Sequence, residues 1–439
     1  MHNGVSTRRD FLRLMAASGA GLALAGCVAE PAAQAPAPSA GTLNPADVKG
    51  ALSYWNSFTG EDERRGFQSV VDSFKGAYPN VDFQVEAVPN ADFMTKFTTA
   101  VQSNSGPDTV MALMERFPDM AGMNGLTDLT GFADNWDGLG EFDRKMLDPF
   151  TVDGKLYALP ALAFVDWIYY RADWFEEAGI AAPPRTWDEF RQVAKAITDP
   201  GKDRYGFGMR GGAGGGAAII KVINAYNGPL TTPDGKTATL DLDAAVAALR
   251  IYTGLLTQDH AVPPSAPNDS YNQVFQSFLT GRTGMLLHHT GSLQSVQNAL
   301  RPMEQVRTMV LPKAQFESTW ILPGGNGVMT STHNPDAAFA WLTHWASPQP
   351  QLDFLKATGY WPTATAAQKD PFIIGNPLYE AATQAVSIGG TPTFFRGFQG
   401  WMDTVVLVET QNVLVGRKPV EEAAGVMVDS LRSIIAGNS

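Results

Sequence analysis

Apolar residues in the first part of the chain alternate between the spacing of strands and the spacing of helices. Residues 52–55 form a short apolar run typical of a strand, and from Glu61 onward the apolar residues recur at helical spacing. Residues 81–87 then alternate apolar and polar side chains, 93–101 return to helical spacing, and 109–113 form an apolar run. This order predicts a parallel sheet built by right-handed crossovers, with ligands bound beyond the carboxyl ends of its strands.

The remainder of the chain predicts a second set of α/β elements. Residues 156–170 are extended and strongly aromatic, and we interpret them as a crossing between two domains. Thr186 and Glu189 form a capping box that opens a helix. Further helices are expected at 243–258, 268–280, 292–300, 335–345, 348–358, 377–386, 402–415 and 420–435, and strands at 205–209, 285–287 and 306–311. No repeat of 20 to 50 residues recurs, which excludes a solenoid or a propeller.

The first residues have the pattern of an export signal followed by a lipid attachment site. Arg8-Arg9 precede Phe11-Leu12, a weakly apolar run from Met15 to Ala25, and then Cys27. Together they resemble a twin-arginine signal peptide (1–26) ending in a bacterial lipoprotein box. The alternative is an uncleaved anchor, but the run is far shorter than the roughly 20 residues of a spanning helix. Residues 27–48 are then the lipid-carrying cysteine and a flexible linker rich in Pro and Ala.

Composition narrows the classes of protein that fit. With 439 residues the chain is long enough for two domains. A net charge of −12 with no cluster of basic residues disfavours a nucleic-acid partner. Cys27 is the only cysteine, so the sequence offers neither a disulfide framework nor a zinc site built from cysteines. No cofactor is expected.

Several motifs carry a resemblance to a known family. They are DGKLYALP at 153–160, YYRADWF at 169–175, AGI at 178–180, PPRTWDEF at 183–190, the Phe275, Phe278, Gly281, Met285 spacing, GGNG at 324–327, which we interpret as a turn, and GYWP at 359–362. The chain resembles the extracellular solute-binding proteins of ABC importers, specifically the group that includes maltodextrin-binding and other sugar-binding lipoproteins. The resemblance covers nearly all of residues 52–434.

The resemblance implies an α/β fold of the type II periplasmic-binding-protein class. Two lobes joined by crossing strands would close on a ligand held between them. Lobe 1 would comprise residues 49–160 plus about 323–375, and lobe 2 residues 161–322 plus part of 376–439. The protein would be a monomer that binds a mono- or short oligosaccharide, delivers it to the permease subunits, and is tethered through lipid to the outer face or periplasmic side of the bacterial membrane.

Candidate ligand contacts are flat aromatic side chains and hydrogen-bonding groups near strand ends, because a sugar offers an apolar ring face and a rim of hydroxyls. From these residue types, and from the positions at which the resemblance implies ligand contacts, the candidates are Trp55, Asn56, Phe58, Glu115, Arg116, Phe164, Asp166, Gly211, His289, Thr290, Gly325, Asn326, Trp361, Arg396 and Trp401. Some have a structural alternative: core packing for Trp55, a salt bridge with Arg116 for Glu115, a mobile or close-packed loop beside the cleft for the glycine run that includes Gly211, and a structural ion pair for Arg396. No phosphate-loop motif follows the glycine run at 211–216.

Other functions remain open at this point. Many relatives place a tryptophan near residues 289–291, and its absence here favours a monosaccharide or a substituted ligand. His288-His289 is a weak metal candidate, since neighbouring side chains on a strand diverge. The scaffold could carry a polyamine, an organophosphate or iron, although Tyr169 and Tyr170 would face opposite sides. An exported carbohydrate-active enzyme would need two facing carboxylates, for which Glu115 and Asp166 are the candidates.

Overall fold

The computed structural model describes residues 43–301, 305–392 and 394–438. The expected export signal, Cys27 and the first part of the linker lie outside these ranges. None of the described helices is both long and apolar enough to cross a membrane.

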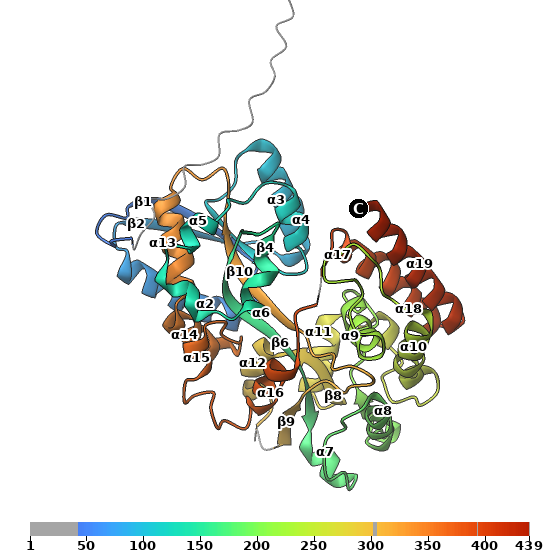
Figure 1. Cartoon of the computed structure of the whole chain (residues 1–439). Helices are drawn as coiled ribbons and strands as arrows, with labels where there is room; N and C mark the ends of the chain where they lie inside the picture. Colours follow the sequence, from blue (N-terminus) through green and yellow to red (C-terminus); the bar gives the residue numbers. More distant parts are fainter. Residues whose placement is uncertain (1–42, 302–304, 393, 439) are drawn as a thin grey trace, which may run out of the picture. The chain divides into compact units, whose positions relative to one another are not determined.

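The first elements form the predicted strand–helix alternation (Figure 1). Strand β1 (Gly50–Asn56) pairs in parallel with β2 (Val81–Ala87) and with β3 (Thr109–Leu113). Helices α2 (Glu61–Ala77) and α3 (Asn90–Ser103) connect them. Because the three strands are parallel, the loops after β1 and β3 emerge at the same edge of the sheet.

A long strand, β6 (Leu159–Arg171), crosses the molecule where an extended crossing was predicted. Its first half pairs with β10 (Ile321–Val328), and its second half pairs with β8 (Thr283–His289) and β9 (Val306–Met309). The strand order is β2-β1-β3-β10-β6-β8-β7, with β9 also on β6. Figure 1 shows β6 and β10 running between two groups of elements. The two-lobed α/β prediction is confirmed.

The expectation of a turn at residues 324–327 is wrong, because these residues lie inside β10. The strand is held between β3 and β6, with an irregularity at Gly324/Gly325. A Cβ atom at Gly325 would lie 2.7 Å from the carbonyl oxygen of Leu159. The glycines therefore serve the close approach of neighbouring strands rather than a change of chain direction.

The other elements complete the two groups. The small strands are β4 (Thr151–Val152), β5 (Lys155–Leu156) and β7 (Tyr205–Phe207); the helices are α4 (Phe117–Gly122), α5 (Thr130–Ala133), α6 (Arg144–Leu147), α7 (Ala172–Glu177), α8 (Trp187–Ala196), α9 (Gly216–Asn227), α10 (Leu242–Thr257), α11 (Tyr271–Leu279), α12 (Leu293–Ala299), α13 (Pro335–Ala346), α14 (Pro348–Thr358), α15 (Thr365–Gln368), α16 (Glu380–Ile388), α17 (Phe398–Trp401), α18 (Leu407–Leu414) and α19 (Val420–Asn438). A π-helical turn at Met402–Val406 precedes α18.

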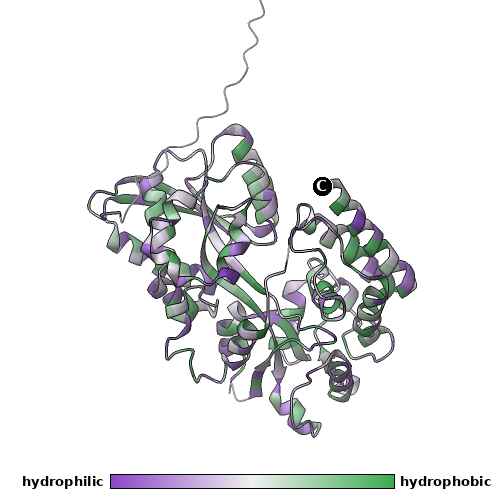
Figure 2. Cartoon of the chain, in the orientation of Figure 1, coloured by the Kyte–Doolittle hydropathy of each residue, from purple (hydrophilic) through white to green (hydrophobic). Residues whose placement is uncertain are grey.

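Two hydrophobic cores stabilise the fold. In the first, Tyr54 and Phe67 pack against Trp341 and Trp345, with ring centroids 5.1 to 6.0 Å apart. The second gathers α8, α9, α10 and α19 around buried side chains such as Trp187. Figure 2 shows β6 coloured largely as apolar, and many of the outer helices carry both apolar and polar residues. Each core supports one side of the space between them.

Candidate functional site

Two adjoining cavities lie beside β8 and α11, and the larger one is also lined by the loop after β1 and by residues of β3. We call the larger one, of about 950 Å³, the outer cavity; Ser57, Phe58, Asn90, Phe164, Tyr271, His289 and Tyr360 are among its lining residues. We call the smaller one, of about 90 Å³, the inner chamber; it is lined by residues that include Asp166, Arg210, Lys221, Tyr252, Tyr271, His288 and His289. Tyr271 and His289 line both, so the two spaces meet at these side chains.

The register of β6 and β8 brings three predicted residues together. Asp166 is the direct cross-strand partner of His289. Phe164 lies two positions from Asp166 on β6 and therefore on the same face of the sheet. The ring of Phe164 meets that of His289 edge-on, with centroids 5.0 Å apart. These three predicted contacts are thus at the cavities.

Arg116 supports the wall of the outer cavity on the β1 side. Its guanidinium donates to Asn90 Oδ1 at 2.7 Å and to Ser57 Oγ at 3.1 Å, and it stacks 3.6 Å above the ring of Phe93. Only 4% of Arg116 is exposed, and burial lowers its pKa to about 10, whereas Glu115 acts to raise it. Arg116 therefore fixes two polar side chains that line the cavity and lies behind them.

Tyr360 forms another part of that wall and was not among the predicted contacts. Its hydroxyl donates to Glu63 Oε1 at 2.6 Å, and its ring lies 5.8 Å from that of His289 in a nearly parallel orientation. Burial, with Glu63 nearby, raises the pKa of Tyr360 well above its usual range. The GYWP motif pointed to this segment, but packing brings Tyr360 to the cavity.

Helix α11 contributes an aromatic face that sequence reasoning missed. Tyr271 stands at its first position, next to Ser270, and is 38% exposed although it lies among the lining residues of both cavities. Its ring lies 4.8 Å from that of His288, and Phe275 lies 5.1 Å from the same imidazole. A large accessible ring within a cavity is suited to stacking on an apolar ligand face.

The inner chamber contains a buried ion pair. Lys221 Nζ lies 3.2 Å from Asp166 Oδ2 and 4.4 Å above the ring of Trp320. Burial raises the pKa of Asp166 and Lys221 opposes that shift. Burial, followed by the charges of Lys221 and Arg210, lowers the pKa of His289 to about 3. The imidazole is therefore neutral near pH 7.

Three predicted tryptophans lie away from both cavities. Trp55 carries the ammonium group of Lys96 4.2 Å above its ring. Trp361 is 2% exposed, and its backbone pairs with that of Ala163. Trp401 is 1% exposed in the second core, where its indole donates to a serine hydroxyl at 2.9 Å. Trp361 and Trp401 belong to the two cores, and Trp55, for which core packing was the alternative, is half-buried against the first core.

Two predicted asparagines are buried in the first core region. Asn56 accepts a hydrogen bond from the backbone of Phe58 at 2.9 Å, so it shapes the loop after β1. Phe58 lines the outer cavity but is 2% exposed. Asn326 accepts from the Tyr54 hydroxyl at 2.7 Å, and Gly325 beside it pairs with Pro160 of β6. Neither Gly325 nor Asn326 lies among the lining residues of the two cavities.

The remaining candidates fall into other places. Glu115 is partly buried beside Arg116 and lines neither cavity. Thr290 is fully buried at the turn after β8. The backbone of Gly211 donates to the Ala266 carbonyl at 2.9 Å, and a Cβ atom there would lie 2.5 Å from the same oxygen. Gly211 is therefore part of a close-packed loop, as its alternative predicted.

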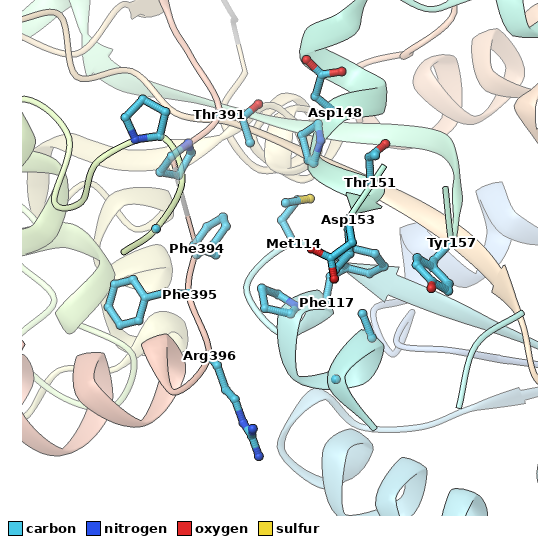
Figure 3. A pocket seen from close by; sticks show the side chains of 18 of the residues that line it. Met114, Phe117, Asp148, Thr151, Asp153, Tyr157, Thr391, Phe394, Phe395 and Arg396 are labelled. Atoms are coloured by element: carbon cyan, nitrogen blue, oxygen red, sulfur yellow. The ribbon is translucent and has the colours of Figure 1, made fainter. Parts of the chain in front are cut away.

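Arg396 lines a separate depression of about 920 Å³ (Figure 3). There Phe394, Phe395 and Arg396 face Met114 and Phe117 across the opening. The two sides of this depression come from segments that are far apart in the sequence.

Comparisons with known proteins agree with this architecture. The family model of the bacterial extracellular solute-binding proteins matches residues 60–352. A binding protein of Brucella abortus is 28% identical over 222 residues, which are 50% of this chain and 53% of that relative, so the chain spans about half of its length. The maltotriose-binding protein of Pyrococcus abyssi is 24% identical and matches 77% of this chain and 72% of its own.

A solved structure extends the likeness of fold. The GacH receptor of Streptomyces glaucescens, known unliganded and in complex with acarbose, superposes with a TM-score of 0.81 at 21% identity and covers 90% of this chain and all of that one. The family model covers well over half of the present sequence. The matched part includes β6, most of the first core, and β8, which contributes lining residues to both cavities. This chain therefore belongs to the bacterial extracellular solute-binding proteins.

Proposed function

We propose that the protein is the extracytoplasmic solute-binding component of an ABC importer and that it binds a carbohydrate in the outer cavity. A relative named for maltotriose supports the ligand class. Ligand binding would shift an equilibrium between open and closed arrangements of the lobes, and the closed form would deliver its sugar to the permease.

The observation that carries the proposal is the make-up of the outer cavity. Accessible rings of Tyr271 and Phe164 lie in the same space as the hydroxyl of Ser57 and the amides of Asn90 and Asn272. Rings can stack on the apolar face of a sugar, while amides and hydroxyls exchange hydrogen bonds with its rim. At about 950 Å³ the cavity is in the size range of small-molecule sites.

Binding without catalysis fits the carboxylates better than glycoside hydrolysis does. Asp166 is engaged with Lys221 in the inner chamber, and Glu115 lines neither cavity. A glycosidase would need both to flank one bond. Iron as a cargo is also less suited, since Tyr169 lies in the first core and Tyr170 in the second.

A ligand screen on the purified full-length protein tests the proposal. A specific sugar stabilises the folded protein by mass action and so raises its melting temperature. At a ligand concentration of about a hundred times Kd, the free energy of unfolding increases by about 2.7 kcal/mol. Tyr271→Ala should abolish that shift, and Tyr205→Ala, a tyrosine outside both cavities, should retain it. If no mono- or oligosaccharide moved the melting temperature of the wild type, the carbohydrate assignment would fail.

We further propose that the mature protein is tethered through a lipid on Cys27 and is a monomer with the lobe boundaries 49–160 plus 323–375 and 161–322 plus part of 376–439. One acylated cysteine and a flexible linker would hold the lobes close to the permease and free to dock. Cys27→Ser should release the protein from membranes while sugar binding persists. Continued membrane association of Cys27→Ser would refute the lipid anchor.

A further inference from the structure

The inner chamber has an unbalanced charge. Two cations, Arg210 and Lys221, and one carboxylate, Asp166, line it. Lys221 is engaged with Asp166. Arg210 donates through Nε to the Ala213 carbonyl at 2.8 Å, and no carboxylate oxygen of the described residues lies within 4.0 Å of its guanidinium. Asp403 acts on Arg210 only from farther away.

A glycine-rich loop is built around this guanidinium. Gly214 has a φ of +76°, and a Cβ atom there would lie 1.9 Å from Nη2 of Arg210. Any larger side chain would displace the arginine. The glycine run therefore positions Arg210 at the edge of the chamber. The guanidinium carbon of Arg210 lies 5.6 Å from the centre of the Tyr271 ring.

Neutral polar atoms complete the chamber. His288 is 6% exposed, bonds through Nδ1 to the Ser292 hydroxyl, and has no partner for Nε2 within the described structure. Nδ1 of His289 is likewise buried without a partner there. Burial lowers the pKa of both imidazoles, so neither adds charge near pH 7. Two imidazole nitrogens among the lining residues are thus unpartnered in the part of the chain that the structure describes.

The outer cavity has the opposite charge. Glu61, Asp62 and Glu63 line it together with a single cation, Arg65, which pairs with Asp62. An anionic group would be repelled there and attracted to the inner chamber, so the two spaces favour one orientation of a ligand that is neutral at one end and negative at the other.

We propose that the ligand is a sugar acid whose carboxylate enters the inner chamber and pairs with Arg210 while its ring occupies the outer cavity. This rests on the proposed carbohydrate function. The chamber, of about 90 Å³, has room for a carboxylate and is small beside the outer cavity of about 950 Å³, so the small charged group is assigned to the chamber and the ring to the outer cavity. A guanidinium binds a carboxylate through two parallel hydrogen bonds, and one such cation matches a single negative charge rather than a phosphate dianion.

Calorimetric titration of the full-length protein with matched ligands tests the inference. We expect D-glucuronate or D-galacturonate to bind roughly ten- to a hundredfold more tightly than glucose or galactose, as a charge-assisted hydrogen bond provides. Glucuronamide, which keeps the shape without the charge, should lose this advantage with the unaltered protein. Arg210→Met should lose it too, whereas Arg432→Met, on the exposed surface, should retain it.

The possible results distinguish failure of the sugar-acid inference from failure of the proposed carbohydrate-binding function. Neutral sugars that bind as tightly as the acids would overturn the sugar-acid inference and leave the carbohydrate function standing. Tighter binding of hexose phosphates than of uronates would overturn the choice of carboxylate. An acid preference that survives in Arg210→Met would refute the role of Arg210. If no sugar of either kind bound, the proposed function itself would fail.

Discussion

The buried pair of Asp166 and Lys221 makes a sharp prediction about stability. The two side chains are only 7% and 10% exposed, and their charged atoms are 3.2 Å apart. Asp166→Asn keeps the size of the side chain but leaves the ammonium group of Lys221 without a carboxylate in a poorly solvated place. Removing one partner of a buried pair costs about 3 to 5 kcal/mol, because the remaining charge has lost its compensation.

That cost is a large share of the roughly 5 to 15 kcal/mol by which a folded domain is stable. Urea denaturation followed by tryptophan fluorescence would measure it, since the chain has ten tryptophans and Trp320 lies beside Lys221. The double variant Asp166→Asn/Lys221→Met provides the comparison: with both charges gone, it should be more stable than Asp166→Asn alone.

The two single variants and the double variant form a thermodynamic cycle. We expect a coupling free energy of about 1 to 3 kcal/mol, as found for residues in direct contact. If Asp166→Asn cost less than about 1 kcal/mol, or if the effects of the two substitutions simply added, the pair would not be buried and mutually compensating as the distances indicate.

Three further substitutions test local features. Burial lowers the pKa of His344 to about 4, so the contribution of this residue to stability is present above pH 6.5 and is lost as pH falls towards 4, by up to about 1.4 kcal/mol per pH unit. His344→Gln should flatten this part of a curve of unfolding free energy against pH. An unchanged slope would contradict the prediction. Gly291→Ala places a Cβ atom 2.7 Å from the ring of Tyr360 and should cost about 1 to 3 kcal/mol in urea denaturation, whereas Gly400→Ala, with open space around it, should be nearly neutral. Thr186→Ala removes the cap that accepts from the amide at the third helical position and should cost about 1 kcal/mol, while a serine there should restore most of it; a serine as costly as alanine would rule out the cap.

Local patterns predicted many elements because their causes lie within a few residues. Strand β2 and helix α14 have the predicted bounds, and α8 begins at the capping box of Thr186 and Glu189, whose reciprocal bonds are both present. Helix α9 (Gly216–Asn227) was missed, because it is buried on nearly all sides and its apolar residues show no helical period.

The candidate site could be predicted only in part. Phe164, Asp166 and His289 were identified because a crossing strand and the end of its neighbour must meet at the space between lobes. Tyr271, Arg210 and Lys221 were not, since they come from separate segments whose meeting depends on tertiary packing. Nothing local to the sequence separates them from surface residues.

The amino-acid sequence alone was enough to predict the class of fold, the crossing strand and the family. Periodicity, caps and motifs involve residues close together in the chain, so they can be recognised before the tertiary structure is known. Which side chains line the two cavities was decided by the register of β6 against β8 and by the packing of α11 and the glycine loop. Register and packing are relations between distant segments, so a tryptophan such as Trp401 is equally plausible in a core or in a site until the chain is folded. The charge difference between the two cavities likewise exists only once their walls are assembled.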